Sequence, residues 1–206
     1  CRSLGEYLNY YESKGEDWER QMLIKADYLA GSEELYNQFI NYLSAFIYPS
    51  SFRISPTEQI KKLKLNIEKN LNDDENIKLI SGGIRDIEFS VQALQLLNGG
   101  RLKSLRTGNT LNAITELQKQ KIISGKESKT LFTSYKLYRK IEHFLQLMND
   151  KQTHSIPVEG ELLDKLVRYT GYQNVIQLDF LEYLYLVLLY RFLRMYLKIK
   201  LFFLLK

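Results

Sequence analysis

The chain has 206 residues, with 29 Lys and Arg against 24 Asp and Glu, and a formal net charge of +5. Because 45% of its residues are apolar and 13% are aromatic, it can bury a hydrophobic core, which excludes wholesale disorder. Eleven Gly and three Pro are few for the turns of an all-β sandwich or barrel, and 35 Leu against 5 Val favour helix over strand.

The excess positive charge lies at one end of the chain. Residues 191–206 hold five basic residues and no acidic residue, so the rest of the chain carries 24 charges of each sign. Nucleic-acid binding usually needs a basic face on the folded domain, and we therefore expect no nucleic-acid partner. The longest uninterrupted apolar run, Tyr183–Tyr190, is far shorter than the ~20 residues that span a bilayer. This predicts no membrane association, with the C-terminal segment interpreted as a core helix in preference to a basic interfacial helix.

The first third of the chain predicts two helices joined at a Gly-Ser break. Ser32 is suited to cap the second helix, which is expected to reach Ile47 and to stop before Pro49. In the first helix, an apolar repeat at i, i+4 predicts one buried face. The helix is expected to end at Gly31, where the Gly-Ser pair interrupts the repeat. The members of that repeat are Trp18, Met22, Ala26 and Ala30.

Further helices are expected along the rest of the chain. Residues 48–55 are predicted to be a loop and residues 57–71 an amphipathic helix, followed by a polar break at 72–76 and a short apolar run at 77–80 that is compatible with an extended segment. Glycine pairs, N-cap residues and helical periodicity then predict helices at about 84–98, 111–117, 126–149, 161–169 and from 175 onward.

Two of these helices carry a polar stripe beside an apolar stripe, both stepping by three and four residues. In the helix from residue 84 the apolar members are Ile84, Ile87, Val91, Leu94 and Leu97, and the polar members are Arg85, Glu88, Gln92 and Gln95. In the helix at 126–149 the apolar members are Leu137, Ile141, Phe144, Leu145 and Met148, and the polar members are Arg139, Glu142, Gln146 and Asn149. We predict a cross-helix network in which Arg85 and Glu88 lie near Glu142 and Arg139, with Gln92 and Gln146 extending the contact.

No self-contained catalytic centre is evident from the residue types. One Cys and two His leave little scope for a metal site or for Ser-His-Asp chemistry, and the single Cys points to a reducing compartment. The sequence contains neither a G-x-x-x-x-G-K-[ST] phosphate loop nor the D-x-D pair common in metal-assisted nucleotidyl transfer. On residues alone, the chain reads as a helical module.

Four segments are similar, in the same order, to motifs of one enzyme family. Residues 81–89 read S-G-G-I-R-D-I-E-F and are followed by Gln92, Gln95-Leu96 and Gly99-Gly100-Arg101. This stretch resembles the signature G-G-I-R-[ED]-I-E-F of glutamine synthetase adenylyltransferase, the bifunctional enzyme that attaches AMP to glutamine synthetase and removes it. Residues 15–26 resemble G-x-D-W-E-R…K-A-R, residues 105–111 resemble the segment after G-G-R, and residues 139–157 resemble R-R-L-E…Q…N-D-x-Q-T…L-P. Asp27 and Asn76 depart from the family's usual Arg and Asp, which weakens the expectation of a phosphate contact at position 27.

The resemblance implies an all-α helical bundle with the truncated C-terminal end of an α/β nucleotidyltransferase domain at its N-terminus. The implied boundary separates residues 1–55, the remnant of that domain, from residues 56–206, the helical bundle. It implies a piece of a larger cytoplasmic enzyme that transfers AMP from ATP to a protein tyrosine with Mg²⁺ and removes it by phosphorolysis. The half of the family that the chain derives from, adenylylating or deadenylylating, stays open.

The expected site residues follow from the matched motifs. The metal-binding and catalytic acids are expected upstream of Cys1, so the chain alone is expected to be inactive. Expected contacts to a nucleotide or partner are Arg20, Lys25, Gly82, Gly83, Arg85, Glu88 and Gln92, and the expected structural network is Arg139, Glu142 and Gln146. A structural interpretation of the first group makes Trp18 a core residue and places its charged neighbours in i, i+4 pairs. The implied partners are glutamine synthetase and a PII-type nitrogen-signalling protein; the alternative is a non-catalytic helical module that binds either of them.

Overall fold

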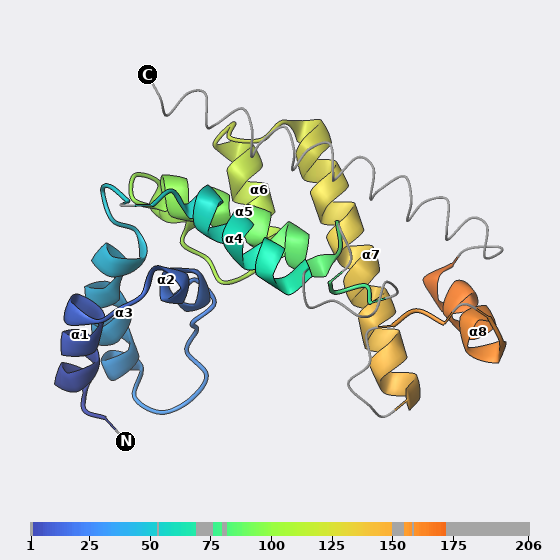
Figure 1. Cartoon of the computed structure of the whole chain (residues 1–206), viewed down its shortest axis with the longest axis horizontal. Helices are drawn as coiled ribbons and strands as arrows, with labels where there is room; N and C mark the ends of the chain where they lie inside the picture. Colours follow the sequence, from blue (N-terminus) through green and yellow to red (C-terminus); the bar gives the residue numbers. More distant parts are fainter. Residues whose placement is uncertain are drawn as a thin grey trace. The chain divides into compact units, whose positions relative to one another are not determined.

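The computed structural model describes residues 2–52, 54–68, 76–79, 82–149, 155–157 and 159–171. These residues form eight α-helices and one short 3-10 helix (Figure 1), which are α1 (Leu4–Ser13), α2 (Asp17–Leu23), α3 (Glu33–Ile47), α4 (Pro56–Glu68), α5 (Ile84–Gly99), η1 (Lys103–Leu105), α6 (Thr110–Lys119), α7 (Gly125–Asn149) and α8 (Glu161–Thr170). Within the described ranges, β structure is limited to an isolated antiparallel bridge between Asn76 and Ser155. The prediction of an all-α fold is confirmed.

The chain divides into two compact units. The first comprises Cys1–Lys62 and Val91–Ile122, and the second comprises Leu63–Ser90 and the described residues from Ile123 onward. The helix α5 therefore contributes its first half to the second unit and its second half to the first. The predicted boundary at residue 55 follows the family's motifs rather than compactness, and it stays a prediction.

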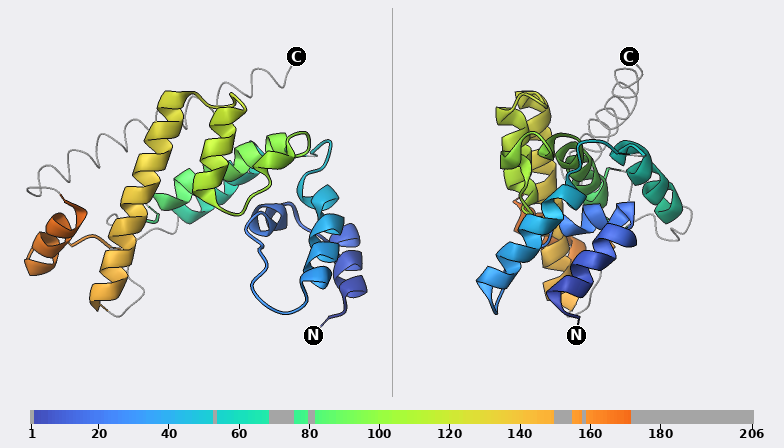
Figure 2. Two further views of the ribbon diagram at one scale, coloured as in Figure 1. Left: turned by 180° about the vertical axis from the view of Figure 1, so that it is seen from behind. Right: turned by 90° about the vertical axis from the view of Figure 1, so that its left-hand side faces the viewer.

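The core of the first unit forms where α1 packs beside α3 (Figure 2). Tyr11 of α1 contacts the rings of Phe39 and Phe46 on α3 at centroid distances of 6.3 and 5.2 Å. The buried residues of this cluster are Tyr11, Leu23, Ile24, Leu43, Ile47, Tyr48 and Leu96. The start of α3 is as predicted, because the Ser32 hydroxyl accepts a hydrogen bond from the backbone N–H of Leu35 at 3.2 Å.

The predicted apolar face of the helix around Trp18 is wrong. The helix α2 ends at Leu23, and the Trp18 and Met22 side chains are 52% and 49% exposed. The buried face carries Glu19, Gln21 and Leu23 instead. Burial of the Glu19 carboxylate is tolerated because it accepts hydrogen bonds from the Tyr10 hydroxyl at 3.2 Å and from the Glu16 N–H at 2.7 Å. The interpretation of Trp18 as a core residue fails with that face.

The helices of the second unit bury the faces that periodicity predicted. Ile84 and Ile87 of α5 are buried, as are Ile141 and Leu145 of α7, whereas Met148 at the end of α7 is 52% exposed. Helix α8 packs on α7 through Phe144 and Tyr169, whose ring centroids are 4.9 Å apart. It ends at Gly171, whose φ of +89° is the left-handed conformation typical of a glycine C-cap.

Several predictions concern residues outside the described ranges, namely the polar break at 72–75, the Asn-Asp-x-Gln-Thr segment from residue 150 and the helix from residue 175. Residues 77–79 form a turn rather than an extended segment, because the N–H of Leu79 donates to the carbonyl of Asn76 at 2.8 Å. None of the helices in the described ranges is long and apolar enough to span a membrane.

Candidate functional site

Numbered in chain order, the first matched motif (residues 15–26) contacts the second (the stretch that begins at residue 81) through a buried pair of glutamines. The side-chain amide of Gln21 on α2 donates to the side-chain oxygen of Gln92 on α5 at 2.6 Å. The two residues are 8% and 6% exposed, and 71 positions separate them in the sequence. A buried hydrogen bond of this kind fixes α2 against α5.

The third motif joins the same junction from α6 and the segment before it. The Lys25 ammonium donates to the Thr110 hydroxyl at 2.6 Å. The buried Gln95 amide of α5 donates to the carbonyls of Leu105 and Thr107 at 2.7 and 2.8 Å. The segments at residues 15–26 and 105–111 therefore meet in the first unit with Gln92 and Gln95, which follow the G-G-I-R signature on α5.

Single substitution of the glutamine pair is expected to cost more than removal of both side-chain amides. The Gln92→Leu variant leaves the buried Gln21 amide without its acceptor, which lowers the free energy of unfolding by about 1–3 kcal/mol. The Gln21→Leu/Gln92→Leu double variant is expected to recover most of that loss, because no buried amide is then left without a hydrogen-bond partner. Urea unfolding of wild type, Gln21→Leu, Gln92→Leu and the double variant measures the coupling, and strictly additive losses would contradict it.

Arg106 caps the C-terminal end of α5, where the Gly-Gly-Arg motif (residues 99–101) begins. Its Nε donates to the carbonyl of Gly99 at 2.8 Å, and an outer nitrogen donates to that of Gly100 at 3.4 Å. Its guanidinium lies 5.0 Å from the centre of the Tyr48 ring. A cation at the last carbonyls of a helix also opposes the negative end of the helix dipole. Arg106 is thus a helix cap that holds Tyr48.

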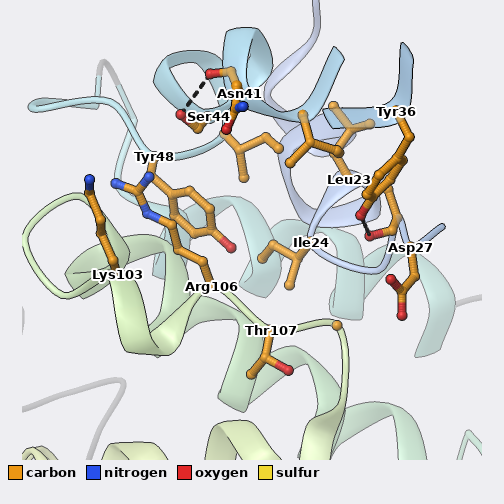
Figure 3. Close-up of a pocket in the computed structure, with 14 residues that line it drawn as sticks. Leu23, Ile24, Asp27, Tyr36, Asn41, Ser44, Tyr48, Lys103, Arg106 and Thr107 are labelled. Carbon is orange, nitrogen blue, oxygen red and sulfur yellow. Dashed lines mark hydrogen bonds between the residues drawn. The ribbon is translucent and has the colours of Figure 1, made fainter. Parts of the chain in front are cut away.

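A pocket of about 450 Å³ opens beside this junction (Figure 3). Buried Leu23, Ile24 and Ile47 form its apolar part. Lys103 and Arg106 lie on one side of the view and Asp27 on the other. The remaining lining residues are Ala26, Tyr36, Ile40, Asn41, Ser44, Tyr48, Thr107 and Gly108. This mixture of an apolar wall with a few polar groups is typical of small-molecule sites.

Tyr48 is expected to make the chain's stability depend on pH in alkali. Burial raises the pKa of Tyr48 to about 12, and the Arg106 guanidinium opposes that rise. The unfolded chain, with a Tyr pKa of about 10, loses this proton first as the pH rises. The stabilisation is therefore complete below about pH 10 and is lost between about pH 10 and 12, by up to about 2–3 kcal/mol. The unfolding free energy of wild type minus that of Tyr48→Phe should therefore fall over that interval; a constant difference would contradict this.

Arg20 and Lys25, the predicted basic contacts of the first motif, are both engaged within the first unit. The Arg20 Nε lies 3.1 Å from an Asp17 carboxylate oxygen, and its guanidinium lies 4.1 Å from the centre of the Phe46 ring. The predicted ion pairing of Arg20 thus occurs at i, i+3. Lys25 forms the Thr110 contact described above.

The glycine pair of the second motif is closed by a carboxylate of its own helix. Gly82 has a φ of +84°, and its N–H donates to the Asp86 carboxylate at 2.7 Å. Gly82, Gly83 and Asp86 are all buried. The Asp86 side chain thereby supplies the negative charge that the N-terminus of α5 favours.

The two polar stripes contact each other through a tyrosine that the sequence analysis did not select. The Tyr135 hydroxyl of α7 donates to the Glu88 carboxylate of α5 at 2.7 Å, and the Arg139 guanidinium lies 5.8 Å from the centre of the Tyr135 ring. Arg139 also donates to the buried Glu142 carboxylate at 2.7 Å.

The remaining stripe residues have varied surroundings. The Arg85 guanidinium lies 5.8 Å from the centre of the Phe89 ring, and Gln146 is half-buried. Gln92 accepts a hydrogen bond from Gln21, and its predicted contribution with Gln146 to the network stays a prediction. The direct approach of Arg85 to Glu142 stays a prediction.

Sequence reasoning missed Gln21, Tyr48, Asp86 and Tyr135. Asp86 carried a usable signal, because an acidic residue three positions after Gly83 suits the first turn of a helix. Within the described ranges, no group of three or more His, Cys, Asp or Glu side chains comes together that could hold a metal ion.

Two family models match adjoining parts of the chain. The one described as GlnD PII-uridylyltransferase matches residues 53–187, which is more than half of the chain. The one described as Glutamate-ammonia ligase adenylyltransferase matches residues 1–42.

Curated relatives named bifunctional glutamine synthetase adenylyltransferase/adenylyl-removing enzyme are similar over most of the chain. The relative from Bartonella henselae is 35% identical over 173 residues, which is 81% of this chain and 18% of the relative. The relative from Idiomarina loihiensis is 35% identical over 160 residues, 76% of this chain and 17% of the relative. The relative from Bifidobacterium longum is 35% identical over 162 residues, 77% of this chain and 15% of the relative.

The chain thus spans less than a fifth of the length of these relatives. The family resemblance predicted from the four motifs is confirmed. The chain belongs, through residues 53–187, to the family described as GlnD PII-uridylyltransferase, and it is similar over most of its length to the glutamine synthetase adenylyltransferase/adenylyl-removing enzymes.

Proposed function

We propose that this chain is part of a bifunctional enzyme that transfers AMP from ATP to glutamine synthetase and removes it by phosphorolysis. The names of the relatives support the activity, and the share of their length that the chain spans supports its being one part of a longer enzyme. The enzyme would be cytoplasmic and would control nitrogen assimilation through glutamine synthetase.

The observation that carries the proposal is the junction in the first unit. The Gln21–Gln92 and Lys25–Thr110 contacts connect three segments that match the family's motifs. Motif residues that hold helices together in this way form a scaffold, because their polar atoms are already bonded to one another. We propose that this scaffold positions a nucleotidyltransferase domain whose Mg²⁺-binding acids lie upstream of Cys1.

The proposed domain boundary follows the motifs. Residues 1–55 complete the nucleotidyltransferase domain, and residues 56–206 form the helical domain after it. The two family models support this boundary, since one ends at residue 42 and the other begins at residue 53.

The experiment supplies glutamine synthetase, ATP and Mg²⁺ to the longer protein that contains this chain and follows AMP on the synthetase by mass spectrometry. AMP transfer and its reversal by phosphate are expected. The 206-residue chain alone, given adenylylated glutamine synthetase and phosphate, is expected to show no turnover. Turnover by the chain alone would overturn the proposed placement of the catalytic acids, and an inactive longer protein would overturn the function.

A second candidate function is binding of a PII-type signalling protein or of glutamine synthetase without catalysis. The match of residues 53–187 to a family described as PII-uridylyltransferase favours it. Calorimetric titration of the chain with each protein separates the candidates: saturable binding by a chain that has no turnover supports an interaction module, and absence of binding to both contradicts it.

A further inference from the structure

The pocket of the first unit contains a hydrogen-bond donor that the fold does not use. The Tyr48 side chain is only 7% exposed, and it lines the pocket. Within the described part of the chain, its hydroxyl has no hydrogen-bond partner. Figure 3 shows this hydroxyl directed into the pocket. A hydroxyl that reaches the pocket in this way is available to donate a hydrogen bond to an acceptor on a bound ligand.

The charges around the pocket indicate what such a ligand carries. Lys103 is exposed and has no acidic partner among the residues described. Arg106 uses two of its nitrogens for the carbonyls at the end of α5, and its other outer nitrogen is not part of those bonds. Asp27 lies on the opposite side of the pocket, where its carboxylate accepts from the N–H of Tyr28 at 2.9 Å. Two cations and one anion leave the lining with one net positive charge.

We propose that this pocket binds a small organic monocarboxylate whose carboxylate accepts a hydrogen bond from the Tyr48 hydroxyl. The positive potential of Lys103 and Arg106 attracts the carboxylate, and the apolar body of the ligand lies against Ile24, Ile40 and Ile47. The pocket volume of about 450 Å³ is large enough to hold a small organic molecule. Asp27 disfavours a second negative charge, so a dicarboxylate is expected to bind more weakly.

Inorganic phosphate offers the same oxyanion chemistry without the apolar body. The pocket is expected to prefer the carboxylate for two reasons. Its net charge matches a monoanion better than a dianion, and the buried isoleucine side chains favour contact with hydrocarbon. The preference between the two anions is therefore part of the test.

The test titrates the 206-residue chain with sodium hexanoate, sodium succinate and inorganic phosphate by calorimetry, at matched ionic strength. Hexanoate is expected to bind saturably and more tightly than succinate or phosphate. Tyr48→Phe keeps the ring over which Arg106 lies and removes the hydroxyl, and it should weaken hexanoate about tenfold or more. Lys103→Gln should weaken it about two- to fivefold.

Lys129→Gln is the matched control, since it removes an exposed positive charge from α7, outside the pocket. It should leave hexanoate binding unchanged. Circular dichroism establishes whether each variant is folded. If Tyr48→Phe does not fold, the comparison of Lys103→Gln with wild type still tests the proposal. Absence of hexanoate binding, phosphate binding at least as tight, or equal affinity of wild type and both pocket variants would overturn the proposal. The assay contains no glutamine synthetase, so its failure leaves the proposed function untouched.

Discussion

The Leu43→Ala variant of the chain is expected to unfold with a free energy about 2–5 kcal/mol lower than that of wild type. Leu43 is fully buried in α3 at the centre of the first unit's core, next to side chains of α1 and α2. Truncation removes apolar contact and leaves a cavity that the aromatic neighbours fill only in part. Because small domains are stabilised by about 5–15 kcal/mol, this loss is a large part of the total. Chemical denaturation followed by tryptophan fluorescence measures it.

Leu35→Ala is the control for Leu43→Ala, because it makes the same change on the same helix at a side chain that is 51% exposed. It is expected to change the free energy of unfolding by less than about 0.5 kcal/mol. Equal effects of the two substitutions would mean that the core of the first unit is not where the structure places it.

The Gly99→Val variant is expected to lose stability by about 1–3 kcal/mol or more. A Cβ at Gly99 would lie 2.5 Å from Cδ1 and 2.7 Å from Cε1 of the Tyr48 ring. The ring cannot move away freely, since it is buried and lies beneath the Arg106 guanidinium. The glycine is thus required by close packing, and its replacement should also displace the pocket wall that Tyr48 forms.

Gly100→Ala provides the comparison for Gly99→Val. Its added Cβ would meet the carbonyl oxygen of Pro49 at 3.4 Å, which is an ordinary contact. Thermal unfolding of both variants should show a marked decrease for the first and little change for the second. A Gly99→Val chain as stable as wild type would contradict the packing of Tyr48 against α5.

Local signals predicted the helices whose ends are set by the residues beside them. The hydroxyl of Ser32 caps α3, the side-chain oxygen of Asn109 accepts from the Asn112 N–H at 3.0 Å to cap α6, and Gly171 ends α8. Each of these contacts joins residues close in sequence, so the sequence contains the whole interaction. The apolar face of α5 was predictable for a similar reason, since its spacing repeats over four turns.

Contacts between distant segments decided the features that the sequence analysis missed. The apolar spacing from Trp18 to Ala30 suggested a buried face, but Glu19, which accepts a hydrogen bond from Tyr10, lies in the interior and Trp18 is exposed. The partner of Gln92 lies 71 residues earlier, so a polar stripe alone could not identify it. Likewise, the pocket depends on Tyr48 and Arg106 meeting beside Gly99, a packing contact with no sequence period.

In the proposed function, this chain is the helical scaffold of an enzyme that places AMP on glutamine synthetase. The most direct test of this proposal is the rate at which the longer protein transfers radiolabelled AMP from ATP to glutamine synthetase when it carries Gly100→Ala or Gly99→Val. Transfer should persist with Gly100→Ala and should decline strongly with Gly99→Val, because this variant disturbs the packing beside the junction that is proposed to position the catalytic domain. Undiminished transfer by the Gly99→Val protein, or no transfer by the wild-type protein, would contradict the account.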